Sequence, residues 1–239
     1  IIDLQAFRNA SNLTSIAIPD GVTSIGTKVF NNCSGLTSVT FGSSSQLTSI
    51  GTYAFQSSGI TSITIPDLVS VIGNYAFNLC SGLTSVTFGS SSQLTSIGTN
   101  AFQSSGLTSI AIPDGVTLLD SFLFSSCSGL TSVTFGPSSQ LTTIGNYAFY
   151  VSSNLTSIAI PDGVTSIGIY AFSSCSGLTS IAIPDGVTSI GNGAFQSSGL
   201  TSITIPDLVS VIGSSVFSSC SSLTSVTFGP SSPILRLEA

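Results

Sequence analysis

Apolar residues return along this chain in one short pattern, in which a leucine is followed by two isoleucines separated by a single residue. In the first copy, Leu13-Thr14-Ser15-Ile16-Ala17-Ile18, the isoleucines are two positions apart, so they lie on one face of an extended strand. Ser15 and Ala17 then point to the opposite face. Later copies carry threonine in place of Ala17, which suits a strand because threonine is β-branched. The pattern predicts a half-buried strand in each copy.

The strand pattern recurs at a nearly constant interval of 22 to 25 residues. A fixed period in this range indicates a solenoid, in which each repeat is one coil that buries its apolar face only against its neighbours. We expect the stacked coils to form one parallel sheet, with strands ~4.8 Å apart. The copies begin at residues 13, 36, 60, 83, 107, 130, 155, 178, 200 and 223.

The rest of each coil carries a turn, a second extended segment and an aromatic residue. Pro19-Asp20-Gly21 ends the first strand, because proline removes a hydrogen-bond donor and Asp-Gly favours a turn. Val22 and Ile25 indicate a second short extended segment, and Val29 and Phe30 are predicted to enter the interior from a short helical or 3₁₀ turn. One phenylalanine per coil predicts a continuous stack of rings in the core, at positions 7, 30, 55, 77, 102, 124, 149, 172, 195 and 217.

Two types of coil mostly alternate along the chain. In the Ile-Pro-Asp type the first strand is followed by a turn such as Pro19-Asp20, and in the Phe-Gly type it ends in a sequence such as Phe41-Gly42-Ser43-Ser44. The alternation fails once, where three Ile-Pro-Asp coils follow one another from Leu155.

Residues 155–175 read LTSIAIPDGVTSIGIYAFSSC, which combines the apolar spacing with a proline, a glycine, an Ala-Phe pair and a cysteine. This segment resembles the BspA-like, Treponema-type class of leucine-rich repeats, and the resemblance covers nearly the whole chain. It implies a β-rich, right-handed leucine-rich-repeat solenoid of about ten coils. One parallel β-sheet would form its concave face, with short extended, 3₁₀ or helical turns on the convex side. The Phe-Gly coils depart from the family pattern because they lack the proline.

We expect residues 1–239 to form a single array. Residues 2–7 align with residues 25–30, the second half of a coil, and the chain stops soon after Phe228-Gly229 begins a connection. Neither end reads as a polar cap, so the sequence is interpreted as a fragment of a longer array with incomplete coils at both ends.

Composition and charge exclude several classes of partner. Charged residues make up only 5% of the chain and the net charge is −6. Phosphate binding requires clustered lysine and arginine, so nucleic acid is not expected as a partner. No apolar run approaches the roughly 18 residues of a membrane helix, so membrane insertion is not expected either. The three basic residues are Arg8, Lys28 and Arg236.

The chain contains no histidine, and this argues against an enzyme that uses a Ser-His-Asp or Cys-His arrangement. Its cysteines recur once in every second coil, so neighbouring cysteines are expected about 10 Å apart, too far for a disulfide. We predict buried, unpaired thiols, with a metal or redox ladder as the weaker alternative, and no cofactor. The cysteines are Cys33, Cys80, Cys127, Cys175 and Cys220.

Aspartates and tyrosines each recur at one equivalent position in several coils, and both are candidates for binding. Aspartates that follow the proline are interpreted as turn residues that bond their own backbone rather than as calcium ligands, and only Asp162, Asp185 and Asp207 fall on consecutive coils. Tyrosines precede the Ala-Phe pair in several coils, where they either bind a sugar or protein or fill a half-buried surface. These are Tyr53, Tyr75, Tyr147 and Tyr170.

The outward positions of the first strands form the candidate ligand face. These residues are Ser15, Ser38, Thr40, Ser62, Thr64, Ser85, Thr87, Ser132, Thr134, Ser202 and Thr204. Asparagines in Asn-x-Ser/Thr triplets are possible glycosylation sites in a secreted protein, namely Asn9, Asn12 and Asn154, whereas Asn32 is a doubtful acceptor because it precedes a core cysteine.

Two functions compete on this evidence. The family resemblance implies a non-enzymatic extracellular or cell-surface scaffold for adhesion or for binding a protein or glycan. The alternative is a structural subunit of an extracellular filament or coat that assembles with copies of itself by end-to-end stacking, since the coils are nearly identical and the surface is neutral. Ice binding by the Ser/Thr array is a weaker idea, because alanine interrupts the threonine column, as at Ala17.

Overall fold

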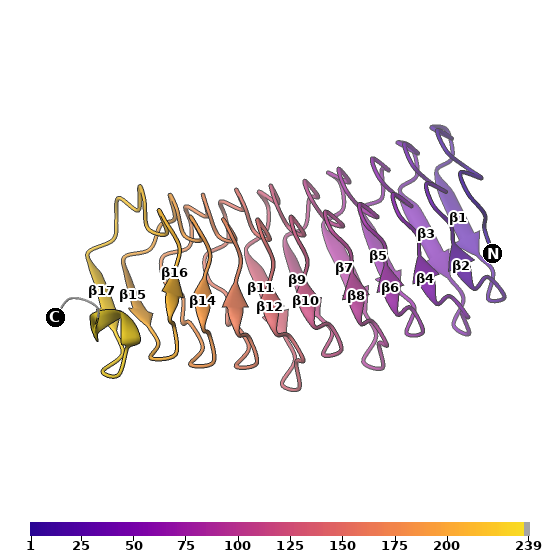
Figure 1. The fold of residues 1–239 in the computed structure, drawn as a ribbon. Helices are drawn as coiled ribbons and strands as arrows, with labels where there is room; N and C mark the ends of the chain where they lie inside the picture. The colour runs from indigo at the N-terminus through magenta and orange to yellow at the C-terminus, as the bar shows by residue number, and fades with distance from the viewer. Residues whose placement is uncertain (237–239) are drawn as a thin grey trace.

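The computed structural model describes residues 1–236, which stack into a parallel-strand solenoid of about nine turns (Figure 1). This confirms the predicted leucine-rich-repeat solenoid. Most turns contain a first strand of four residues and a second strand of two. The first strands are β1 (Ser15–Ile18), β3 (Ser38–Phe41), β5 (Ser62–Ile65), β7 (Ser85–Phe88), β9 (Ser109–Ile112), β11 (Ser132–Phe135), β15 (Ser202–Ile205) and β17 (Ser225–Phe228).

The second strands follow the turn after each first strand, and a short 3₁₀ helix, η1 (Pro233–Arg236), follows β17. The second strands are β2 (Ser24–Ile25), β4 (Ser49–Ile50), β6 (Val71–Ile72), β8 (Ser96–Ile97), β10 (Leu118–Leu119), β12 (Thr143–Ile144), β13 (Ser166–Ile167), β14 (Ser189–Ile190) and β16 (Val211–Ile212).

The two sets of strands differ in how far their ladders extend. The second strands form two long parallel ladders, β2-β4-β6-β8 and β10-β12-β13-β14-β16. The first strands pair only two by two, as β1–β3, β5–β7, β9–β11 and β15–β17. In the coils that begin at Leu155 and Leu178, an isolated bridge between Ala159 and Ala182 takes the place of a strand pair. The expected parallel direction is confirmed, but the single continuous sheet is not.

Proline accounts for the positions where the first-strand ladder stops. In each strand pair an Ile-Pro-Asp coil is followed by a Phe-Gly coil, and in β15–β17 the amide of Gly229 donates to the carbonyl oxygen of Ile205 over 2.9 Å. Where the following coil is of the Ile-Pro-Asp type, the same position is a proline such as Pro66 or Pro206, which has no N–H to donate. The ladder is therefore interrupted at each of these boundaries.

One phenylalanine from each coil forms the centre of the core, as predicted. Neighbouring rings stack with centroids 5.1 to 6.0 Å apart, from Phe7 to Phe217. The eight rings from Phe30 to Phe195 are fully buried, and the two terminal rings are partly buried. Because each ring covers the next, burial of one coil depends on the presence of its neighbours.

The segment around Val29 and Phe30 is a series of tight turns, so the prediction of a helical or 3₁₀ turn there was wrong. Two residues of each such segment, four positions apart, have a left-handed backbone, as at Tyr53 (φ 58°) and Ser57 (φ 55°). Every second amide of the segment donates to the next coil, as from the nitrogen of Phe30 to the carbonyl oxygen of Ala54 over 2.7 Å. A helix would direct these bonds back to its own coil.

Hydroxyl groups repeat the bonding between coils on the first-strand side. In six coils the threonine that follows the first leucine donates from Oγ1 to the carbonyl oxygen of the matching threonine in the previous coil, as from Thr84 to Thr61 over 3.3 Å and from Thr131 to Thr108 over 3.0 Å. On the opposite side an amide ladder does the same, and Gln56 Nε2 donates to Asn78 Oδ1 over 2.9 Å. Uncharged side chains therefore supply these hydrogen bonds between neighbouring coils.

Removing one ring from the stack is expected to destabilise the solenoid. Phe102→Ala leaves a cavity between two fully buried rings, and we expect it to lower the free energy of unfolding by about 3–5 kcal/mol in urea titrations. Leu118→Ser is the matched control, because Leu118 is 39% exposed and other coils carry serine there; its effect should stay within about 0.5 kcal/mol. Equal effects of the two substitutions would contradict the stacked core.

Candidate functional site

The residues predicted as the ligand face all lie on the outward side of the first strands. Burial alternates along β5, where Ile63 and Ile65 are buried and Ser62 and Thr64 are exposed. Ser85 and Ser132 are half-buried, and the other predicted residues are exposed. The structure brings these residues together in pairs on neighbouring strands and not at one point. The pairs with bonded hydroxyl groups are Thr64 with Thr87 and Thr204 with Thr227, each at 2.9 Å.

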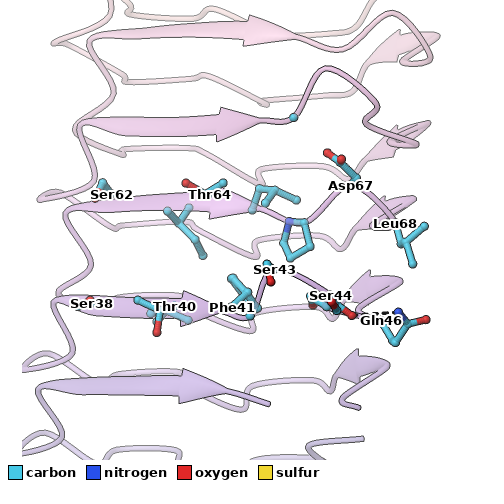
Figure 2. Close-up of a pocket in the computed structure, with 17 residues that line it drawn as sticks. Ser38, Thr40, Phe41, Ser43, Ser44, Gln46, Ser62, Thr64, Asp67 and Leu68 are labelled. Carbon is cyan, nitrogen blue, oxygen red and sulfur yellow. Dashed lines mark hydrogen bonds between the residues drawn. The ribbon is translucent and has the colours of Figure 1, made fainter. Parts of the chain in front are cut away.

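The face is hollowed where β3 and β5 fail to pair. We call this hollow the β3–β5 groove; its volume is about 780 Å³ (Figure 2). It contains Ser38, Thr40, Ser62 and Thr64 of the predicted ligand face. The groove lies at a boundary where the next coil carries Pro66, so the interrupted ladder and the hollow coincide.

The walls of the β3–β5 groove include residues that the sequence did not reveal. Phe41 is half-buried in it, while Asp67 and Leu68 lie beyond the end of β5 (Figure 2). The loop after β3 is fixed by Gln46, whose Nε2 donates to the carbonyl oxygen of Ser44 over 2.9 Å. The sequence did mark this coil as unusual, because Leu68 occupies a position where most Ile-Pro-Asp coils have glycine.

A second hollow lies between the coil that begins at Leu178 and strand β15. We call it the β15 groove; its volume is about 440 Å³. Ser202 and Thr204 of the predicted ligand face line it, together with Pro206 and Asp207. The following coil again supplies a proline at the boundary, as in the β3–β5 groove.

The four turn aspartates that precede a Phe-Gly coil pack against the glycine of that coil, which corrects the expectation that they serve to bond their own backbone. A Cβ atom placed on Gly42 would lie 2.0 Å from Asp20 Oδ1, and one on Gly89 would lie 1.8 Å from Asp67 Oδ1. Each carboxylate therefore occupies the space that a side chain would need in the next Phe-Gly coil. In the last such pair Asp207 Oδ1 also accepts a hydrogen bond from the amide of Ser231 over 2.9 Å. The contact is made where an Ile-Pro-Asp coil is followed by a Phe-Gly coil.

Asp162, Asp185 and Asp207 are the turn aspartates that fall on consecutive coils. Over residues 1–236 no three or more acidic, cysteine or histidine side chains form a group that could hold a metal ion. Asp162 is followed in the next coil by Pro184 instead of glycine, and Pro184 is buried.

The cysteines are free thiols, and Cys33, Cys80, Cys127 and Cys175 are buried, as predicted. Each Sγ donates to the carbonyl oxygen of a core phenylalanine in the previous coil, as from Cys80 to Phe55 over 3.0 Å. Burial raises the pKa of the Cys80 and Cys127 thiols from the ordinary 9.0 to about 11, and that of Cys175 to about 12. Such thiols remain protonated at neutral pH and are poor nucleophiles.

The tyrosine column forms short ladders on the turn side. Tyr53 stacks on Tyr75 with centroids 4.8 Å apart, and Tyr147 stacks on Tyr170 at 5.2 Å. The Tyr170 ring ends against Gly193, where a Cβ atom would lie 2.2 Å from Cε1. All four tyrosines are half-buried, and much of their ring surface is covered by stacking on neighbouring coils. The surface-filler interpretation fits this arrangement.

The possible glycosylation sites Asn9, Asn12 and Asn154 are exposed. Asn32 is exposed too, but its Nδ2 donates to Asn9 Oδ1 over 3.2 Å. Glycosylation of these residues stays a prediction. Within residues 1–236 the solenoid has no helix of the length and hydrophobicity that a bilayer requires.

Comparison with known proteins gives a match over most of the sequence. A family model described as a BspA type leucine rich repeat region matches residues 1–131 and 142–235, with six copies. No curated protein matches the chain significantly.

Several solved structures share the fold. The pneumococcal vaccine antigen PcpA matches with a TM-score of 0.63 and 26% identity, over 91% of this chain and 62% of that one, so this chain spans less than two thirds of its length. A leucine rich cell surface protein from Faecalibacterium prausnitzii matches with a TM-score of 0.50 and 26% identity, over 95% and 82%. A leucine rich repeat protein of T. pallidum, at 22% identity and a TM-score of 0.52, covers 89% and 79% and shows the fold alone.

The aspartate–glycine contact is open to a double-mutant test. Gly89→Ala forces a methyl group against the Asp67 carboxylate, and we expect a loss of about 1–3 kcal/mol in the free energy of unfolding. Adding Asp67→Ser removes the clash and should recover most of that loss. Gly21→Ala is the control, because nothing lies within 4 Å of its Cβ position. Additive effects of the two substitutions at 67 and 89 would contradict the contact.

The buried thiols predict a loss of stability in alkali. Unfolded cysteines ionise near pH 9.0, whereas Cys80 and Cys127 in the folded chain do so only at about 11. Their contribution is therefore complete below pH 9 and declines as the pH rises to about 11, on the order of 2 kcal/mol for each. Tm measured from pH 8 to 11 should fall less steeply in the Cys80→Ala/Cys127→Ala variant. Parallel curves for variant and parent would contradict this assignment.

Proposed function

The chain belongs to the BspA-type leucine-rich repeat family, and we propose that it is a non-enzymatic scaffold at the cell surface or outside the cell that binds a protein partner. The observation that carries the proposal is the β3–β5 groove, a hollow of about 780 Å³ on the first-strand face. It combines the half-buried ring of Phe41 with exposed hydroxyl groups such as Thr40 and Thr64. Serine, threonine, glutamine and aspartate make up more than half of its lining, so the groove offers hydrogen-bonding groups beside a smaller apolar surface.

The chemistry of the side chains supports a binding role over catalysis. The sequence has no histidine, and the pKa values of Cys80, Cys127 and Cys175 are raised by burial. These groups do not titrate near neutral pH, which is where general acid–base catalysis operates. A net charge of −6 with three basic residues supports a partner other than nucleic acid.

The location outside the cell rests on two of the structural relatives. One is named a vaccine antigen and the other a cell surface protein, each at 26% identity to this chain. Adhesion through the first-strand face is the role we assign on this basis. Assembly into a filament by end-to-end stacking stays a prediction from the sequence. Measuring the molecular mass at increasing protein concentration tests it, because stacking raises the mass.

A binding array tests the proposed function. The labelled chain is applied to immobilised matrix proteins and to a glycan array, beside a Thr64→Arg variant that fills the β3–β5 groove. We expect saturable binding to at least one matrix protein and at least 10-fold weaker binding by the variant. Ala111→Arg is the matched control, because Ala111 is the equivalent exposed position in β9 and lies outside both grooves.

Two results would contradict the proposal. Binding to no matrix protein would reject a protein partner, and binding to glycans alone would replace it by a carbohydrate. Equal loss in the Thr64→Arg and Ala111→Arg variants would show that the β3–β5 groove is not the site.

A further inference from the structure

Two distant coils carry the same departure from the repeat sequence. Residues 61–73 and 201–213 are identical, and both read TSITIPDLVSVIG. The other four Ile-Pro-Asp coils carry Ala, Gly and Thr where these two carry Thr, Leu and Ser, as at residues 17, 21 and 23. At the next position the two coils have Val71 and Val211, where three of the other four have serine.

These substitutions lie on the surface and not in the core. Leu208 is 60% exposed, Val211 is 57% exposed and Val71 is 41% exposed, while Leu68 is half-buried. The inward residues of the same coils keep the common pattern. The fold does not need aliphatic side chains at these positions, because other coils use glycine and serine there. Exposed aliphatic groups that recur at matched positions are typical of a contact surface.

Each of the two coils also forms one wall of a groove. Thr64, Pro66 and Asp67 line the β3–β5 groove, and Thr204, Pro206 and Asp207 line the β15 groove. The two threonines are held in the same way, each by a hydroxyl of the following coil at 2.9 Å. The grooves differ in their other wall, a Phe-Gly coil in the first and an Ile-Pro-Asp coil in the second, and the second is smaller.

The chemistry shared by the grooves indicates the occupant. Asp67 is the charged residue that lines the β3–β5 groove, and it lies beside Leu68 and Pro66. The matching wall of the β15 groove carries Asp207, and the opposite wall adds Asp185. Leu208 follows Asp207 in the chain and is exposed next to the groove, without being part of its lining. A carboxylate next to aliphatic groups fits a lysine or arginine that adjoins an apolar side chain, and the nearby hydroxyls suit a peptide backbone.

We propose that the chain is bivalent, and that each groove takes a peptide segment of a partner protein with a basic residue beside an apolar one. This inference rests on the proposed function and extends it. The two coils are six turns apart, which corresponds to ~29 Å at the usual strand spacing. A partner with such segments in tandem, or with several copies of one segment, would engage both grooves and gain avidity.

The probe is an acetylated, amidated hexapeptide, Gly-Ser-Phe-Lys-Ser-Gly, followed by amide chemical shifts of the labelled full chain. We expect saturable shifts at both grooves, with weaker binding at the smaller one. Leu68→Gly should weaken binding at the β3–β5 groove at least 5-fold and leave the β15 groove unchanged, and Leu208→Gly should do the reverse. Both variants restore the glycine of the other coils, so the fold is preserved. The same peptide with Glu in place of Lys should bind at least 5-fold more weakly.

Two such peptides joined by a flexible linker of about 28 Gly/Ser residues, whose mean span matches the separation, test bivalency. We expect this tandem peptide to bind the parent chain at least 10-fold more tightly than the single peptide, and to lose that gain in either single variant. Shifts confined to the β3–β5 groove, or no gain from the tandem peptide, would overturn bivalency while leaving the proposed function intact. Equal binding of the Glu peptide would overturn the basic segment. Absence of both peptide and array binding would reject both proposals.

Discussion

Each coil in this protein is stable only because the next coil covers it, and the stacked phenylalanines are where that dependence is concentrated. The ring centroids of adjacent coils lie only 5.1 to 6.0 Å apart, so nothing else fits between one coil and the next. Every other feature must repeat at the same interval, so a side chain at one position meets its own copy in the next coil. Threonine and asparagine suit this geometry, because a hydroxyl or an amide both donates and accepts. Charged groups do not, since like charges ~4.8 Å apart repel by about 1 kcal/mol even in water.

The low charge of the sequence follows from this constraint. Aspartate recurs in the turn after the first strand, but from Asp20 to Asp114 it does so only in alternate coils, where glycine in the coil between leaves space for the carboxylate. The same alternation decides where the surface opens. Proline in the following coil interrupts the ladder, and both grooves lie at such boundaries. A local backbone property therefore places the candidate binding sites on an otherwise uniform face.

Much of the fold follows from periodicity alone. The two-residue spacing of Ile16 and Ile18 was enough to predict which side of each strand is buried, and one phenylalanine per coil was enough to predict the ring stack. The left-handed residues were not predictable, because tyrosine, serine and leucine at these positions carry no signal for a positive φ. Their conformation is imposed by bonds to the next coil, which a single coil cannot reveal.

The candidate site was predicted only in part, for a related reason. Outward serine and threonine residues follow from strand alternation, so Thr40 and Thr64 were predicted correctly as exposed. The groove between their strands depends on a missing hydrogen-bond ladder, and its rim includes Asp67 together with Gly89 of the next coil, against which the Asp67 carboxylate packs. Both are relations between coils of different types. Such relations can be found in the sequence only by comparing the coil that begins at Ile60, position by position, with the coils before and after it.

The aspartate–glycine contacts have a consequence for folding. Nearly identical coils allow a growing stack to misalign by one turn, because the core residues would still match. Over the alternating part of the chain such a slip places Asp20 or Asp67 against a proline instead of a glycine, so the correct alignment is favoured. The three successive Ile-Pro-Asp coils from Leu155 lack this discrimination. That segment is where the chain is most exposed to kinetic trapping, and where insertion or deletion of a whole coil would be tolerated most easily.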